Sequence, residues 1–230
     1  MERKINPLLI WIAEFLFPAT CLTCRARRPR WSSSVICARC ASQIIPYQGS
    51  YRALVPEIDF FHAAGFFQGP LRRVILAFKY QRKAAVTPFL IDFFVRTCSR
   101  PLTEIDCVIP VPLSWWSELR RGYNQSKLLA DEIGRRYGKP VHRGCLRRRW
   151  GPSQTRLSRS ARFQNASAGF RLSRSHSLQR LNTVLLIDDV CTTGATLRAC
   201  ARLLKKAGVK RVWGGTIAQK VGDFRVRKGS

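Results

Sequence analysis

The sequence predicts an α/β protein in which helices flank a parallel sheet, and the pattern near the C-terminus carries this prediction. An apolar run over residues 183–187 is followed by helical spacing over residues 197–204, which Gly208 ends. A second apolar run follows over residues 209–218. A strand, a helix and a strand in this order form a βαβ unit with parallel strands and a right-handed crossover. The length of 230 residues fits one such domain with a small appendage.

The composition is strongly basic, with 41 Lys and Arg against 13 Asp and Glu and a formal net charge of +28. Residues 134–187 contain no acidic residue but 13 Arg and Lys. Such a block repels itself unless an anion binds to it, so a polyanionic partner is expected. The alternative is that the arginines lie scattered over solvated faces.

The N-terminal residues 1–19 predict an amphipathic helix, because apolar side chains recur at helical spacing. The apolar stretch over residues 7–19 is too short to span a bilayer and contains Glu14. A signal peptide is the competing reading, but no small-x-small cleavage site follows. We therefore expect no membrane span and a cytoplasmic protein.

Four cysteines follow in two CxxC pairs separated by twelve residues, Cys21/Cys24 and Cys37/Cys40. Two such knuckles supply four thiolates to one tetrahedral ion, which predicts a structural zinc site over residues 20–45. Iron in place of zinc and disulfide pairing are the alternatives. The other five cysteines have no regular spacing and are expected to be small buried hydrophobes in a reducing compartment; they are Cys98, Cys107, Cys145, Cys191 and Cys200.

Between this module and the βαβ unit, apolar periodicity alternates between strand and helix, and the whole of residues 60–220 is expected to form one domain. The expected elements are a strand or hairpin over 60–68, helices over 71–80 and 86–95, a strand over 107–112, a helical stripe over 115–137 and a strand over 141–146. Residues 147–167 lack a period and predict a long functional loop. Residues 221–230 carry no motif and are expected to be a frayed tail.

Two adjacent carboxylates, Asp188 and Asp189, follow the buried run over residues 183–187 and are expected to begin a turn. In a parallel sheet this is the edge where ligands bind. The hydroxyls and backbone N–H groups of residues 192–196 suit a phosphate at the start of a helix. The carboxylates can accept hydrogen bonds from sugar hydroxyls or lie near a hydrated magnesium ion. A capped helix with two solvated acids is the bland alternative.

This run resembles the 5-phosphoribosyl 1-pyrophosphate (PRPP) signature of type I phosphoribosyltransferases. In that family's pattern the acidic pair, here Asp188 and Asp189, holds the ribose hydroxyls, and magnesium accompanies PRPP. Purine-salvage members carry a further Asp where this chain has Thr192, so the run is closer to the orotate type. The loop that the resemblance assigns to the 5-phosphate consists of Thr192, Thr193, Gly194, Ala195 and Thr196.

Further motifs follow the four cysteines in one order: Phe78-Lys79-Tyr80, Val111-Pro112, Arg121-Gly122-Tyr123-Asn124-Gln125, and Gln154, Leu157, Arg162, Asn165 and Phe170. This order resembles the ComF (competence protein F) family over nearly the whole chain. The resemblance implies a phosphoribosyltransferase fold with a zinc ribbon, and a link to natural transformation and use of external DNA. Residues that it places at the pyrophosphate or in a hood over it are Lys79, Arg121, Asn124, Gln154 and Arg162.

Three functions remain open from the sequence. The first is a phosphoribosyltransferase that transfers the sugar from PRPP, or a related phosphorylated sugar, to an unknown acceptor; no general base is identified. The second is a non-catalytic adaptor that binds single-stranded DNA or proteins of DNA uptake. The third is a ligand-sensing regulator on the same fold. The adaptor reading draws on the charge and on possible base-stacking tryptophans near basic residues, namely Trp31, Trp115, Trp116 and Trp150.

Overall fold

The computed structural model describes residues 19–28, 34–49, 57–81, 83–148, 169–173, 178 and 180–220. The helix expected over residues 1–19 falls outside this part of the chain except for Ala19, and the tail expected over 221–230 lies wholly outside it. No helix of the described part is both long and apolar enough to cross a bilayer.

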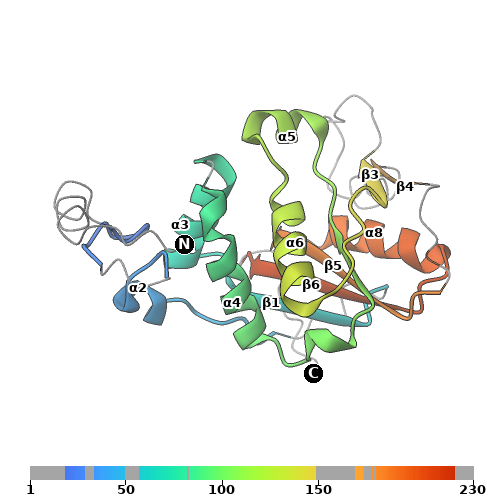
Figure 1. Cartoon of the computed structure of the whole chain (residues 1–230), viewed down its shortest axis with the longest axis horizontal. Coiled ribbons are helices and arrows are strands. Elements are labelled where there is room, and N and C mark those ends of the chain that lie inside the picture. The colour runs from blue at the N-terminus through green and yellow to red at the C-terminus, as the bar shows by residue number, and fades with distance from the viewer. Residues whose placement is uncertain are drawn as a thin grey trace, which may run out of the picture.

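A four-stranded parallel sheet forms the centre of the molecule, as the sequence predicts (Figure 1). Its strands lie in the order β1 (Phe60–Phe66), β6 (Arg211–Gln219), β5 (Thr183–Cys191) and β2 (Cys107–Pro110). Each neighbouring pair is parallel. All four carboxyl ends therefore meet at one edge of the sheet.

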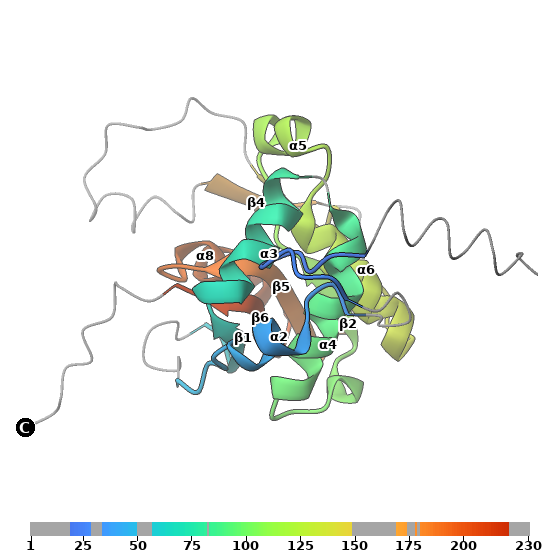
Figure 2. The same ribbon diagram turned by 90° about the vertical axis from the view of Figure 1, so that its left-hand side faces the viewer.

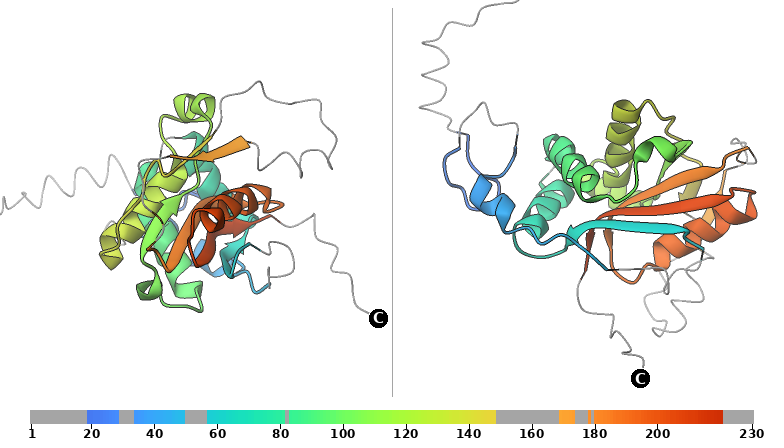
Figure 3. Two further views of the ribbon diagram at one scale, coloured as in Figure 1. Left: turned by 90° about the vertical axis from the view of Figure 1, so that its right-hand side faces the viewer. Right: turned by 90° about the horizontal axis from the view of Figure 1, so that it is seen from below.

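Helices cover both faces of the sheet, which confirms the predicted α/β class (Figure 3). Alternate side chains of β5 enter different cores: Leu185 and Ile187 belong to one, Val184 and Leu186 to the other. The first core is closed by α3 (Gly69–Tyr80), α4 (Thr87–Thr97) and α6 (Gln125–Tyr137), and the second by α8 (Ala195–Lys206). The short 3-10 helices η1 (Ala84–Val86) and η2 (Leu102–Glu104) lie in the connections.

Two expectations between β2 and β5 need correction. The single helical stripe over 115–137 is two helices, α5 (Trp115–Arg121) and α6, because Gly122 takes a left-handed conformation with φ 82° and ends α5. The strand expected over 141–146 is reduced to an isolated bridge between Val141 and Val108. The chain then forms a separate antiparallel ribbon of β3 (Leu146–Arg148) and β4 (Phe170–Leu172).

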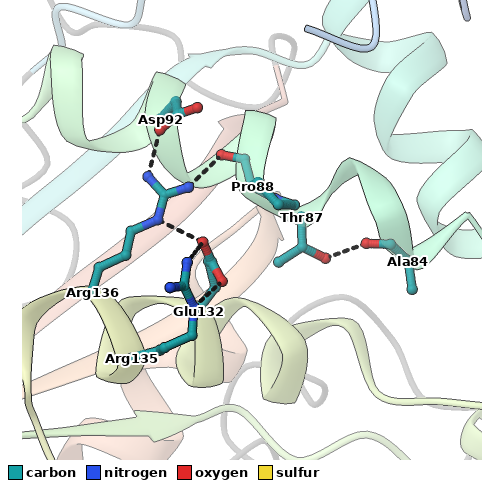
Figure 4. Close-up of polar contacts among 7 residues, drawn as sticks. All are labelled: Ala84, Thr87, Pro88, Asp92, Glu132, Arg135 and Arg136. Atoms are coloured by element: carbon teal, nitrogen blue, oxygen red, sulfur yellow. Dashed lines mark hydrogen bonds and ion pairs between the residues drawn. The ribbon is translucent and has the colours of Figure 1, made fainter. Parts of the chain in front are cut away.

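Helix α6 is fixed on two sides. A Cβ at Gly134 would lie 2.4 Å from Val141 Cγ2 and 2.8 Å from the Lys139 carbonyl oxygen, so glycine allows the close approach of this chain segment. On the other side Arg136 joins α6 to α4 by contacts to Asp92 and the Pro88 carbonyl (Figure 4). These contacts hold the N-terminus of α6 at the carboxyl edge of the sheet.

The N-terminal module packs on α3 (Figure 2). It contains an antiparallel bridge between Thr20 and Arg27 and the short helix α2 (Ala38–Ser42). Cys21 and Cys40 belong to the same buried cluster as Val74 and other apolar residues of α3. Arg73 Nη1 also donates to the Thr23 carbonyl at 3.2 Å. The module is therefore part of the core that positions α3.

Candidate functional site

The connections that follow β2 and β5 leave the sheet towards opposite faces, although the two strands are neighbours. The chain after β2 leads to α6 in one helical layer, and the chain after β5 leads to α8 in the other. A crevice is expected where two adjacent parallel strands diverge in this way, and ligands of open α/β sheets bind there. The candidate site lies at this point.

Asp188 and Asp189 lie at this edge, but they belong to β5 and not to a turn. The strand continues to Cys191 because Asp188, Val190 and Cys191 still pair with β6. The expected end of the strand at Ile187 is therefore wrong by four residues. Strand β2 stops earlier, opposite Ile187, so β5 extends past it and carries the two acids beyond its neighbour. Asp188 is partly buried and Asp189 is buried.

Asp188 is held by neutral donors. Ser126 Oγ donates to Asp188 Oδ1 at 2.8 Å, and the backbone N–H of Asp189 donates to the same oxygen at 2.9 Å. Loss of solvation and the adjacent charge of Asp189 together raise the pKa of Asp188 to about 7, and the Ser126 hydrogen bond opposes this only in part. The site therefore disfavours two full negative charges.

Asp189 is held by a cation from the end of α3. Lys79 Nζ lies 2.7 Å from Asp189 Oδ1, and their side chains are only 15% and 10% exposed. The structure thus brings Lys79, which the sequence placed near the pyrophosphate, directly against the acidic pair. Contact with a diphosphate stays a prediction.

The two central motifs of the sequence contact each other beside the acids. The Tyr123 hydroxyl donates to the Phe78 carbonyl, and the Arg121 guanidinium lies 5.4 Å from the centre of the Tyr80 ring. Arg121 Nη1 also donates to Gln125 Oε1 at 3.0 Å. These contacts join the end of α3 to the segment between α5 and α6. Arg121 therefore lies in this junction, and its predicted contact with pyrophosphate stays a prediction.

Asn124 links α6 to the loop that follows β2. Its Oδ1 accepts from the Ser126 N–H at 2.9 Å, which caps α6, and its Nδ2 donates to the Val111 carbonyl at 3.1 Å. Val111 N–H in turn donates to the Ile187 carbonyl. Asn124 thus positions both the loop and Ser126, and its predicted place near the pyrophosphate stays a prediction.

The turn between β5 and α8 offers free backbone donors. Gly194 takes a left-handed conformation with φ 74° at the N-cap of α8, and no side chain caps the helix. Ala195 and Thr196 form the first turn of α8, while Thr192 and Thr193 lie in the turn before it. Gln219 Nε2 supports this turn by donating to the Thr192 carbonyl at 3.1 Å. Uncapped N–H groups at a helix N-terminus attract an anion.

The four sulfur atoms of the N-terminal cysteines lie within 4.8 Å of one another; they belong to Cys21, Cys24, Cys37 and Cys40. The sulfurs of Cys24 and Cys37 are 3.7 Å apart, much longer than a disulfide bond of about 2.05 Å. Tetrahedral zinc with Zn–S bonds of about 2.3 Å requires about 3.8 Å between sulfurs. The arrangement is therefore compatible with a zinc ribbon.

Two predicted residues, Gln154 and Arg162, lie outside the described part of the chain, as do Trp31 and Trp150. Ser126 is the contact that the sequence analysis missed. It follows the motif that ends at Gln125, but its acceptor Asp188 is 62 residues away, and local patterns carry no sign of such a pairing. Of the five scattered cysteines, Cys98 is only half-buried and the other four are buried as expected.

We predict that Asp188→Asn stabilises the protein at alkaline pH. A carboxyl whose pKa is raised by folding contributes stability below its unfolded pKa of about 3.9 and loses it as pH rises through the folded value. Asparagine keeps an acceptor for Ser126 without the charge. Urea unfolding should show the variant gaining more than about 1.4 kcal/mol over wild type between pH 5 and pH 8, the value of one pKa unit.

Asp131→Asn is the matched control, because Asp131 pairs with Arg143 on the surface, where both side chains are a third or more exposed. This variant should gain nothing over the same pH range. An equal gain in both variants would contradict the assignment of the effect to the acidic pair.

Comparison with known proteins identifies the domain. A family model described as "Phosphoribosyl transferase domain" matches residues 128–222, which include Ser126's helix, β5, the turn and α8. Together with the parallel sheet and its two helical layers, this match assigns a phosphoribosyltransferase fold. The four-cysteine module precedes it.

Two solved structures share this fold at low similarity. Orotate phosphoribosyltransferase from Aeropyrum pernix is 15% identical with a TM-score of 0.37, and 64% of each chain is covered. Adenine phosphoribosyltransferase from Thermoanaerobacter pseudethanolicus is 14% identical with a TM-score of 0.38, covering 61% of this chain and 83% of that one. Neither similarity bears on the chemistry of this chain.

Curated relatives cover most of the chain. "DNA utilization protein YhgH" of Escherichia coli (strain K12) is 27% identical over 190 residues, 80% of this chain and 78% of the relative. "Competence protein ComFC" of Bacillus subtilis is 30% identical over 139 residues, 60% of this chain and 55% of the relative. "Competence protein F" of Haemophilus influenzae is 32% identical over 202 residues, 83% of this chain and 88% of the relative. At this identity and coverage, the chain belongs to the competence protein F family.

Proposed function

We propose that this protein binds magnesium PRPP at the carboxyl edge of the sheet and acts in the use of DNA. The observation that carries the proposal is the pair Asp188 and Asp189, which lies between a cation, a hydroxyl donor and an uncapped helix N-terminus. PRPP presents matching groups: vicinal hydroxyls for the carboxylates and phosphates for the N–H donors and the cation. The names of the relatives, competence and DNA utilization proteins, support the link to DNA.

Each side of the site would bind one part of the ligand. The carboxylates accept hydrogen bonds from the ribose hydroxyls, and the turn over residues 192–196 binds the 5-phosphate at the start of α8. Magnesium, bound with PRPP, would balance the diphosphate charge and lie near Asp188 and Asp189, whose oxygens are its preferred ligands. The loop after β2, held by Asn124, supplies backbone groups beside the diphosphate.

Transfer from PRPP breaks the bond between ribose C1 and the diphosphate oxygen, and the bonding electrons leave with diphosphate. An acceptor nucleophile then bonds to C1 and loses its proton. This chain contributes positioning and electrostatic stabilisation of the leaving group, and the reaction requires no side-chain nucleophile. His62 is unsuited to proton transfer at this site, because Nε2 contacts the Phe94 carbonyl at 3.1 Å and burial lowers its pKa to about 4.

We predict that the wild-type protein binds magnesium PRPP with a micromolar dissociation constant. The double variant Asp188→Asn, Asp189→Asn should weaken binding at least a hundredfold, because amides replace both charge-assisted acceptors. Isothermal titration calorimetry measures both proteins, and the surface variant Asp131→Asn should bind like wild type. Folded wild type that fails to bind would overturn the proposed ligand.

Zinc is the proposed occupant of the four-cysteine cluster. The thiolate donor set and the sulfur spacing fit a closed tetrahedral site, which leaves no position for a reacting water. Its role is therefore structural: it holds together a segment that is too short to build its own core.

We predict one equivalent of zinc per chain, measured by inductively coupled plasma mass spectrometry of the purified protein. Cys24→Ser should lose most of the zinc and lower the melting temperature, since the metal's binding energy supports folding. Cys98→Ser is the control, because Cys98 is half-buried outside the cluster, and it should retain the full equivalent. Equal zinc content in the two variants would contradict the assignment.

A second candidate function is binding of single-stranded nucleic acid, and the β3–β4 ribbon favours it. Arg147 and Arg171 are exposed and directly opposite each other in the ribbon. Like charges in this position destabilise a pair of strands, and neither residue forms an ion pair within the described chain. Helix α5 additionally exposes Trp115 and Trp116, which are 56% and 69% exposed. A strand of phosphates and bases complements both features.

If this second function holds, a fluorescent single-stranded oligothymidylate should bind with a steep salt dependence. Arg147→Gln with Arg171→Gln should lower the slope of log affinity against log salt by about 1.4, or about 0.7 per phosphate contact. Arg96→Gln, at an exposed position in the last turn of α4, is the control and should change the slope less. Absence of binding at physiological salt would exclude this function.

A further inference from the structure

The ion pair between Lys79 and Asp189 is largely withdrawn from water, unlike the other ion pairs of the described chain, which expose at least one side chain by 24% or more. Removing two charges from water costs free energy that their attraction offsets only with good geometry. A pair kept at this cost beside a ligand site points to a role for the charge itself.

The main chain at Lys79 is fixed while its side chain can move. Phe78, the residue before it, is fully buried, and its carbonyl accepts the hydroxyl of Tyr123. The lysine side chain carries an ammonium on a flexible four-carbon stem with three rotatable donors. It can therefore change its partner without any change in α3.

The two acids differ in how much their partners compete with a ligand. Asp188 is held by Ser126 and by the Asp189 N–H, which are neutral donors on one oxygen. Asp189 Oδ1 is occupied by the Lys79 ammonium. A ribose hydroxyl that donates to Asp189 therefore competes with Lys79, and displacement leaves the cation without a partner in a poorly solvated place.

The released cation lies on the side of the site away from α8. Helix α3 belongs to the core that also contains α4 and α6, whereas α8 belongs to the core on the opposite face of the sheet. The uncapped N-terminus of α8 serves the 5-phosphate in the proposed function. The second anionic group of PRPP, the diphosphate on C1, is thus the group left for Lys79.

We propose that Lys79 is an exchangeable counter-ion, which neutralises Asp189 in the free protein and transfers to the diphosphate when ribose hydroxyls occupy Asp189. This inference rests on the proposed binding of PRPP and adds a determinant of specificity to it. The exchange couples recognition of the sugar to recognition of the diphosphate. A ligand with both groups satisfies every charge, whereas ribose 5-phosphate displaces Lys79 without providing it with a new partner.

The test compares magnesium PRPP with ribose 5-phosphate by calorimetry on wild type and Lys79→Met. Exchange predicts that the variant loses tenfold to a hundredfold in PRPP affinity, about the effect of one charge-assisted hydrogen bond. Ribose 5-phosphate should bind the variant within threefold of wild type or more tightly, because its competitor for Asp189 is gone. Lys79→Arg should recover most of the PRPP affinity.

The controls separate the possible failures. Lys205→Met removes an ion pair of the same 2.7 Å length, with Asp59, on α8, and should leave both affinities unchanged. Lys79→Gln can still donate to Asp189, so it provides a folded neutral variant should the methionine fail to fold, with the same expected ratio. Equal losses for the two ligands would overturn exchange and leave PRPP binding intact. Wild type that binds neither ligand would overturn both proposals.

Discussion

Two neighbouring carboxylates at the free end of β5 impose the constraint around which the site is organised. Their charges repel each other, and the crevice solvates them poorly, which is why the pKa of Asp188 rises. Two separate elements reduce this cost: α6 supplies the Ser126 hydroxyl and α3 supplies the Lys79 ammonium. The placement of both helices is therefore a requirement of the acidic pair and not only of the core.

Helix α6 meets this requirement because its N-terminus is fixed from several directions. Asn124 caps it and also binds the carbonyl of Val111 after β2, so the helix and the neighbouring loop move as one unit. At its other end, Gly134 and Arg136 hold it against the Val141 segment and against α4. A site held by the termini of rigid elements keeps its geometry better than one held by loops alone.

The sequence predicted what local patterns encode and missed what depends on distant pairing. Apolar runs identified the sheet strands β2, β5 and β6, and the acids were placed at the correct edge because parallel strands share their carboxyl ends. The extension of β5 through Asp188 and Asp189 was missed, since aspartate is depleted in strands and only the ladder to β6 holds these residues extended. Division of the stripe at Gly122 depends on its left-handed conformation, and the partners of the acids lie 62 residues or more away.

The four-cysteine module is connected to this chemistry through α3. Its Cys21 and Cys40 share a core with α3, and Arg73 in that helix binds the Thr23 carbonyl between the first two cysteines. The same helix ends at Tyr80, where Tyr123 and Arg121 hold it and Lys79 meets Asp189. One twelve-residue helix thus has the cysteine cluster near its start and the acidic pair at its end. Since a helix transmits displacement as a rigid rod, a metal that orders the module also fixes the position of the cation at the site.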